Sequence, residues 1–232
     1  MIDIETLDIL PQAAVLSIGV VYIDHDLNMS DELYIKLDID EQLGLGSNYF
    51  TYNLDTLAWW DSQPAHVRDN TFGGTTSIAD ACKQMYMFFK KRPKAMYVAR
   101  GNDFDFPIID NLFRQSGRGG KPWKFYHQMD YRTMCNFFPP EFYNFPEEND
   151  AQHDALSDAK YQARGMIKML KSLSVNACWR KEKQPLLPGK ARAILRSSPN
   201  NFCRSKRLIV FNFKAPCRSS SKRCCLWGGK ET

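Results

Sequence analysis

The pattern of apolar positions along the chain opens with an antiparallel sheet. Residues 14–23 form an almost unbroken apolar run, the strongest strand signal in the sequence, and residues 32–39 alternate between apolar and polar positions. The polar residues 24–28 between them are typical of a turn, and residues 1–6 carry a further strand pattern. The three segments together predict a meander that begins the sheet of the domain.

Helical periodicity then alternates with strand patterns. A short helix is predicted at 55–60, capped by Asn53 or Asp55, and a longer amphipathic helix at 77–91. An apolar run at 94–100 is typical of a buried parallel strand. The elements predicted after it are a helix through residue 113, a short strand at 125–131, a short helix at 131–138 and a long helix from 153 to about 173. This order of elements predicts an α/β fold.

Two adjacent tryptophans, Trp59 and Trp60, stand on the first of these helices. Aromatic side chains can serve as stacking platforms for nucleobases, but a pair on a short helix more often closes a hydrophobic core. We therefore expect the pair to pack into the core.

Composition limits the class of protein. Hydrophobic residues make up 44% of the 232-residue chain, which is enough for a sizeable core, and no apolar run approaches the ~20 residues of a membrane span. The N-terminus lacks the basic and apolar segments of a signal peptide, and the seven cysteines show no paired metal-ligand spacing. We expect a cytoplasmic protein with free thiols and no membrane partner.

Charge divides the chain near residue 173. Residues 1–173 contain 17 Lys and Arg against 24 Asp and Glu, whereas residues 174–232 contain 14 against 2. We expect an acidic domain at 1–173 and a basic tail at 174–232. The proline- and serine-rich tail favours a disordered extension over a segment that holds a phosphate backbone. A zinc site in the tail is disfavoured because its candidate cysteines lack His partners or CxxC spacing: Cys203, Cys217, Cys224 and Cys225.

Acidic residues on the first strand are the first candidates for chemistry. Asp3 and Glu5 are two residues apart, so a strand places both carboxylates on one face of the sheet. Neighbouring carboxylates near a core are costly unless a cation neutralises them, which favours a metal site. The solvent-facing side of an edge strand would produce the same pattern, so these two residues alone leave both interpretations open.

Further acids stand at the ends of later elements. Asp105 lies where the strand at 94–100 runs into a helix, the edge of α/β sheets at which functional groups gather. Asp158 lies at the start of the last helix, and His153 precedes it by five residues. Taken alone, His153 fits a surface imidazole equally well. Carboxylates without softer ligands select Mg²⁺ or Mn²⁺ rather than zinc.

Three short motifs carry these residues, in the order Asp3-Ile4-Glu5-Thr6, Asn102 to Pro107 and His153 to Asp158. They resemble the DEDD superfamily of 3′–5′ exonucleases, in the subgroup (DEDDh) whose last motif has a histidine five residues before its aspartate. The segments around Trp59 and Asp105 are also similar to the exodeoxyribonucleases of T-even bacteriophages and to a related bacterial exoribonuclease-like family. The resemblance covers about residues 1–172. It implies a ribonuclease H-like fold, with a mixed five-stranded sheet and helices on both faces.

The resemblance also implies a catalytic site. Two divalent ions, Mg²⁺ or Mn²⁺, would lie about 3.5–4 Å apart and be ligated by Asp3, Glu5, Asp105 and Asp158. His153 would act as the general base that takes a proton from the attacking water. A nucleoside 5′-monophosphate would leave.

Four further residues are candidates for supporting roles. Thr6 and Leu7 resemble the family positions that meet the terminal 3′-hydroxyl and wedge against the last base. Asp130 resembles a family position near the site. Asp103 is a spare acid that fits either a place around the metal ligands or a cap of the following helix, and we favour the cap.

The sequence departs from the family pattern at two places. Many relatives carry an asparagine four residues before the second-motif aspartate, where this chain has Gly101, so Asn102 receives no catalytic role. The first motif begins at residue 3, whereas relatives have several residues ahead of it, and a shortened first strand would weaken the sheet.

The resemblance predicts a metal-dependent 3′–5′ exonuclease acting on the 3′ ends of single-stranded nucleic acid, in the host cytoplasm if the protein is phage-encoded. DNA is slightly favoured because of the phage-like run around Asp105. Two alternatives stay open: an exoribonuclease with the same site, and a non-catalytic nucleic-acid-binding protein whose basic tail is the working part.

Overall fold

The computed structural model describes residues 1–145 and 153–182, and side chains only as far as residue 173 in the last helix. The predictions for the tail beyond residue 182, including those for Cys203, Cys217, Cys224 and Cys225, lie outside the described residues.

The chain begins with an antiparallel meander, as the apolar pattern predicts. Its strands are β1 (Ile2–Thr6), β2 (Val15–Ile23) and β3 (Met29–Lys36), and they lie side by side in that order. The third strand ends three residues earlier than expected, because the side chain of Asp38 accepts a hydrogen bond from the backbone of Glu41 and begins helix α1 (Ile39–Gly44). The sequence patterns missed this short helix.

A second, parallel pair of strands follows, β4 (Tyr97–Ala99) and β5 (Gln128–Asp130). Strand β4 contacts β1, but within residues 1–145 and 153–182 the ladder hydrogen bonds form two separate sheets. The α/β class is therefore observed, and a single five-stranded mixed sheet stays a prediction.

The helices follow the predicted order with small changes at their ends. Beyond α1 they are α2 (Leu54–Asp61), α3 (Ala65–Thr71), α4 (Ile78–Lys90), α5 (Asn102–Gln115), α6 (Tyr131–Cys135) and α7 (Ala155–Glu182), with short 3₁₀ turns at Phe125–His127 and Pro140–Phe142. Asn53 caps α2 and Ser77 caps α4, each through its side-chain oxygen. Helix α7 continues to Glu182, past the end expected near residue 173.

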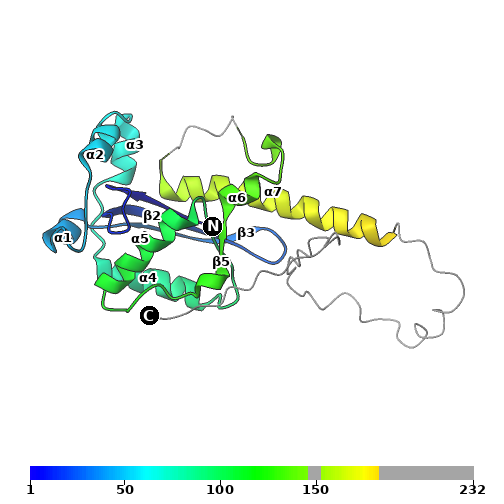
Figure 1. Ribbon diagram of the computed structural model, residues 1–232, viewed down its shortest axis with the longest axis horizontal. Helices are drawn as coiled ribbons and strands as arrows, with labels where there is room; N and C mark the ends of the chain where they lie inside the picture. The colour runs from blue at the N-terminus through cyan, green and yellow to red at the C-terminus, as the bar shows by residue number, and fades with distance from the viewer. Residues whose placement is uncertain (146–152, 183–232) are drawn as a thin grey trace, which may run out of the picture. The chain divides into compact units, whose positions relative to one another are not determined.

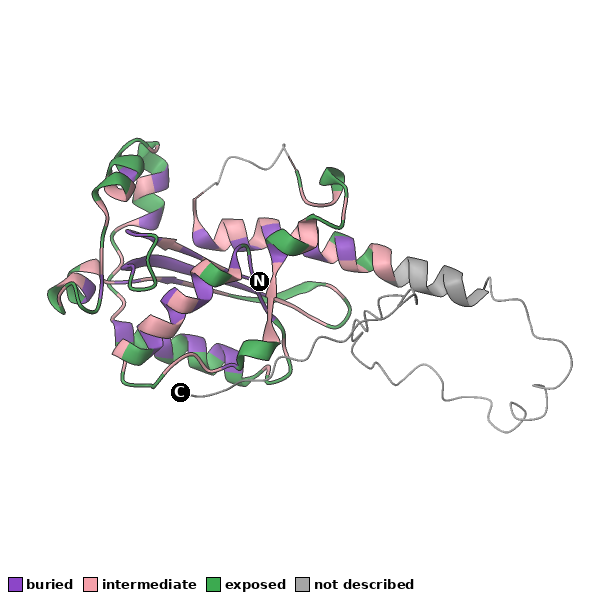
Figure 2. Cartoon of the chain, in the orientation of Figure 1, coloured by how far each residue is buried: buried purple, intermediate pink, exposed green. Residues whose placement is uncertain are grey.

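Helices cover both faces of the antiparallel sheet (Figure 1). One core joins the sheet to α4 and α5, and a second core joins the inner face of α7 to residues of β2, β4 and α6. Figure 2 shows buried residues along β1 and β2 and on the inward faces of these helices. The amphipathic patterns of 77–91 and 153–173 therefore face the cores that they predict.

Gly19 sets how closely α7 approaches the sheet. A Cβ atom at this position would lie 2.1 Å from the carbonyl oxygen of Ala155, in the first turn of α7. In the strand pairing Gly19 stands opposite Asp3. The missing side chain thus lets the start of α7 lie directly beside the acidic residues of β1.

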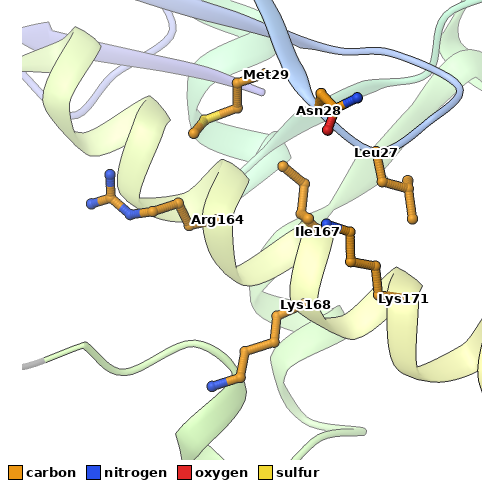
Figure 3. Close-up of a pocket in the computed structure, with 7 residues that line it drawn as sticks. All are labelled: Leu27, Asn28, Met29, Arg164, Ile167, Lys168 and Lys171. Atoms are coloured by element: carbon orange, nitrogen blue, oxygen red, sulfur yellow. The ribbon is translucent and has the colours of Figure 1, made fainter.

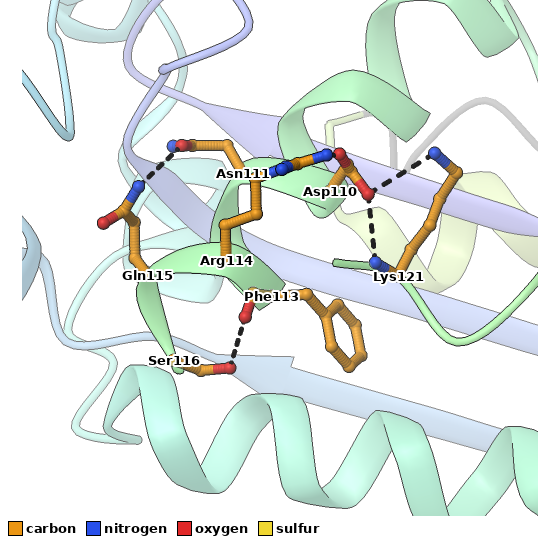
Figure 4. A network of polar contacts seen from close by, with 7 residues as sticks. All are labelled: Asp110, Asn111, Phe113, Arg114, Gln115, Ser116 and Lys121. Carbon is orange, nitrogen blue, oxygen red and sulfur yellow. Dashed lines mark hydrogen bonds and ion pairs between the residues drawn. The ribbon is translucent and has the colours of Figure 1, made fainter. Parts of the chain in front are cut away.

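A polar network fixes the far end of α5 (Figure 4). Asp110 accepts hydrogen bonds from the Arg114 side chain and from the backbone N–H of Lys121. Gly120, at φ 135°, leaves room for the Asp110 carboxylate. The loop after α5 is therefore tied back onto the helix that carries Asp105.

In the part of the chain that the structure describes, no helix is both long and apolar enough to cross a membrane.

Candidate active site

The first two candidate acids lie on one face of β1. Asp3 and Glu5 are partly buried and alternate with the buried residues Ile2 and Ile4, as a strand period of two requires. The pairing with β2 is continuous from residue 2 to residue 5, so both carboxylates stand on a regular strand within the fold.

Asp105 reaches β1 from the first turn of α5. Its side chain is 3% exposed, and its carboxyl is hydrogen-bonded to the backbone of Ile4. The backbone turns sharply into α5 at Gly101, whose φ of 101° is open to glycine at little cost. A carboxylate that the sequence places 100 residues from β1 thus lies against it.

The expected capping role of Asp103 is wrong. Gly101 occupies the cap position, and Asp103 lies inside the first turn of the helix. Asp130 supplies the missing acceptor: its Oδ1 accepts from the backbone N–H groups of Gly101 (2.7 Å) and Asn102 (3.4 Å). Its Oδ2 accepts from the backbone N–H of Thr133 and caps α6 as well. Asp130 is therefore a structural link between two helix starts.

His153 and Asp158 are held together at the start of α7. The backbone N–H of His153 donates to Oδ2 of Asp158 at 3.0 Å. Asp154 accepts a hydrogen bond from the backbone N–H of Ser157 through its side chain and from that of Asp158 through its carbonyl, which is the pattern of a helix cap. The cap orients the first turn, from which Asp158 faces the sheet.

The predicted residues converge. Three potential metal-ligand atoms, one each from Glu5, His153 and Asp158, lie within 4.8 Å of one another. Among the described residues this is the one such group of three or more side chains. Asp3 and Asp105 are outside this group but close enough for their charges to act on it: Asp3 interacts with Asp158, and Asp105 with both acids of β1. All five predicted side chains therefore lie in one region.

The acids of this region repel one another and are poorly solvated. Burial and then the charge of Asp158 raise the pKa of Asp3 to about 8. Burial, followed by the charge of Asp3, raises the pKa of Glu5 and of Asp105 well above the ordinary values. Burial also raises the pKa of Asp158. The four carboxyls have too little positive charge around them to be ionised at the same time.

The protein's own cations offset little of this repulsion. Arg100 lowers the pKa of Asp3 and of Asp158, and Arg132 lowers that of Asp105, but in each case the raising effects dominate. The acids of this region offer carboxylate oxygens, and oxygen ligands suit a hard divalent cation. The chemistry of the residues present therefore fits Mg²⁺ or Mn²⁺.

Sequence patterns missed one residue that supports the site, Gln162, and expected another, Trp59, in the core. Gln162 is buried and donates from Nε2 to Oδ1 of Asp3 at 2.7 Å. It follows Asp158 by one helical turn, so the spacing could have placed it on the same face. Trp59 packs edge-on against the His153 ring, with 4.7 Å between centroids. Trp60 is buried as expected, whereas Trp59 is 40% exposed.

The two predicted substrate-binding residues close the end of β1. The hydroxyl of Thr6 donates to the carbonyl of Asp8, and Leu7 is 3% exposed. Ile9, two residues further on, is 71% exposed. The roles of Thr6 and Leu7 stay predictions, and the exposed apolar side chain at this end of the strand belongs to Ile9.

A cavity of about 530 Å³ lies elsewhere, between the β2–β3 hairpin and α7 (Figure 3). It is lined by Leu27, Asn28, Met29, Arg164, Ile167, Lys168 and Lys171. It contains no acid and is not the region in which the motif residues meet.

Comparison with known proteins finds nucleases that are similar to this chain. A model of the 3′-5′ exoribonuclease Rv2179c-like domain matches residues 1–170. An exodeoxyribonuclease of Enterobacteria phage T4 is 27% identical in an alignment of 157 positions that covers 57% of this chain and 68% of the phage protein.

Solved structures show the same fold. A zinc-bound complex of E. coli ExoI with single-stranded DNA matches with a TM-score of 0.55 and 17% identity, over 77% of this chain and 41% of that one. The E. coli Exonuclease I complex with a dT13 oligonucleotide matches with a TM-score of 0.53 and 18% identity, over 77% of this chain and 42% of that one. This chain thus spans about two fifths of those proteins.

Proposed function

Because the chain belongs to the family of 3′-5′ exoribonuclease Rv2179c-like domains, we propose that its motif residues form a two-cation site for hydrolysis of the terminal phosphodiester. The family match and the phage relative make the protein a 3′–5′ exonuclease of the DEDD superfamily, as the motifs predict. The observation that carries the proposal is the meeting of β1, α5 and α7 around mutually repelling carboxyls.

The proposed roles follow from position. The four acids hold the cations: Asp3, Glu5, Asp105 and Asp158. Two bound divalent ions supply a water of lowered pKa and stabilise the negative charge that develops on the leaving oxygen. His153, within reach of Glu5 and Asp158, takes the water's proton as the water oxygen bonds to phosphorus. The bond from phosphorus to the preceding nucleotide's O3′ breaks, and a nucleoside 5′-monophosphate leaves.

The substrate we propose is the 3′ end of a single strand, with DNA slightly favoured. The family name points to RNA and the phage relative to DNA, and the run around Asp105 is the phage-like feature that tips the choice. We assign Thr6 and Leu7 to the end of β1 that receives the last nucleotide. The exposed Ile9 extends this end with an apolar surface for a base.

We also propose how the sheet is completed and how the chain is divided. The contact of β4 with β1 supports one functional five-stranded sheet, with the acids at its centre. We assign exonuclease activity to residues 1–173 and treat the basic residues 174–232 as a separate part of the chain, in a cytoplasmic protein.

The test is digestion of matched DNA and RNA oligonucleotides, labelled at the 5′ end, with Mg²⁺ or with excess EDTA. We expect a ladder that shortens from the 3′ end, release of mononucleotides and faster digestion of DNA. Asp3→Ala, Asp105→Ala and Asp158→Ala should each lower the rate by at least about a thousandfold while circular dichroism stays unchanged.

Two results would redirect the proposal. Faster digestion of RNA would make the protein an exoribonuclease with the same site. Binding of oligonucleotides without mononucleotide release would favour a non-catalytic binding protein. Repeating the assay with a chain that ends at Lys183 separates any contribution of the basic tail while α7 is kept.

A further inference from the structure

His153 has a backbone conformation that its neighbours must maintain. Its φ is 66°, in the left-handed region that residues with a Cβ atom occupy at a cost of about 1–2 kcal/mol. The direction of its imidazole therefore depends on contacts that hold the backbone in this state.

Both the backbone N–H and the backbone carbonyl of His153 form hydrogen bonds. The N–H donates to Asp158, five residues later, at 3.0 Å. The carbonyl accepts from Oγ1 of Thr71 at 2.9 Å, across 82 residues of sequence. Thr71 is 0% exposed and is the last residue of α3. Because buried hydroxyls are normally hydrogen-bonded, the bond from this buried hydroxyl to the carbonyl of His153 is a specific structural contact.

Thr71 is itself fixed relative to the acids. Phe72, the next residue, packs edge-on against Trp60 at 5.4 Å between ring centroids. The indole N–H of Trp60 donates to the carbonyl of Thr6 at 2.9 Å, at the end of β1. The strand that carries Asp3 and Glu5 is thus connected through Trp60 and α3 to the carbonyl of His153.

We infer that Thr71 is a positioning residue for His153, a role that rests on the proposed function of His153 as the base. Its hydroxyl holds the left-handed conformation, which keeps the imidazole beside Glu5 and Asp158. Without it, the backbone can relax and the ring moves away from the reacting water.

Valine and serine separate the hydroxyl from the shape of the residue. We expect Thr71→Val to lower kcat about ten- to a hundredfold with KM within about twofold, since a displacement of ~1 Å has effects of this size. Thr71→Ser keeps the hydroxyl and should retain kcat within about threefold of wild type. Thr51→Val is the matched control, because the Thr51 hydroxyl is also buried but has no partner among the described residues, and its kcat should not change.

A double-mutant cycle with His153→Ala shows whether Thr71 acts through the histidine. In that background Thr71→Val should have no further effect. A further loss by the same factor would show a merely structural role and overturn the inference. Activity of His153→Ala equal to wild type would instead overturn the role of the base, and wild-type activity of Thr71→Val beside an impaired His153→Ala would overturn the inference alone.

A measurement without catalysis completes the test. The chain has four histidines, so the imidazole NMR signals of His153 can be assigned by comparison with His153→Ala. In metal-free protein these signals should shift in Thr71→Val and stay in place in Thr71→Ser. Unchanged signals in Thr71→Val would contradict the inference.

Discussion

Gln162 illustrates how a single neutral residue supports a charged site. Its Nε2 donates to Oδ1 of Asp3, which favours the ionised form of that carboxyl against burial and the charge of Asp158. Residues that orient a metal-binding carboxylate typically change cation affinity without contacting the cation.

We expect Gln162→Leu to weaken Mn²⁺ binding about ten- to a hundredfold, because the pKa of Asp3 rises further and a proton competes with the cation. Isothermal titration calorimetry measures the affinity. Gln115→Leu is the control, since Gln115 bonds to Asn111 at the other end of α5. Equal Mn²⁺ affinity in Gln162→Leu and wild type would refute this role.

At the scale of elements, the site depends on how closely helices approach β1. Gly19 admits the first turn of α7, and Asp130 joins the starts of α5 and α6. Each residue acts on elements that carry the acids, and neither is a candidate ligand.

Gly19→Ala should displace α7, because the new Cβ would meet the backbone of Ala155 rather than a flexible side chain. We expect the free energy of unfolding to fall by about 3 kcal/mol, together with weaker Mn²⁺ binding. Gly44→Ala, at a position where a Cβ meets nothing within 4 Å, should leave both unchanged. Chemical denaturation and calorimetry test the pair, and similar results for the two variants would contradict the close approach.

Asp130→Ala removes the cap of α6 and the side-chain acceptor at the start of α5 at once. The free energy of unfolding should fall by about 1–3 kcal/mol, whereas Asp103→Ala should change it by no more than about 0.5 kcal/mol. Urea titration of the two variants distinguishes them. A larger loss of stability for Asp103→Ala than for Asp130→Ala would instead support the capping role that the sequence predicts for Asp103.

Local signals predicted most of these elements, whereas the resemblance of the three motifs to a known family singled out the five motif residues. The period of the first strands, the cap Asn53 and the order of the motifs depend on neighbours in sequence. The role of Asp130 and the contact of Thr71 with His153 depend on which segments meet after folding, so no spacing indicates them. Asp103 was misjudged because Gly101 already turns the chain into α5.

At the scale of the whole molecule, the acids couple stability to pH. In metal-free protein the folded pKa of Asp3 is about 8, against an ordinary value of 3.8, and those of Glu5, Asp105 and Asp158 are also raised. The folded state therefore binds more protons than the unfolded state between these values. The contribution of these four acids to stability is therefore fully present below the pKa of the unfolded state, and it is lost as pH rises through the pKa of the folded state.

The melting temperature in EDTA should consequently fall as pH rises from about 5 to about 8, and Mn²⁺ should stabilise the protein increasingly over the same range because it binds the ionised acids. Differential scanning calorimetry at several pH values measures both trends. In Asp105→Asn, which lacks one of the raised groups, the slope in EDTA should be shallower. A melting temperature that rises with pH in EDTA would contradict the arrangement of the acids.

Direct counting of bound Mn²⁺ by electron paramagnetic resonance tests the central claim that these carboxylates form a two-cation centre. We expect two ions per chain in the wild type and fewer, or much weaker, binding in Asp105→Asn. An unchanged count in Asp105→Asn, or no binding at millimolar Mn²⁺ by folded wild-type protein, would show that the acids do not form this centre.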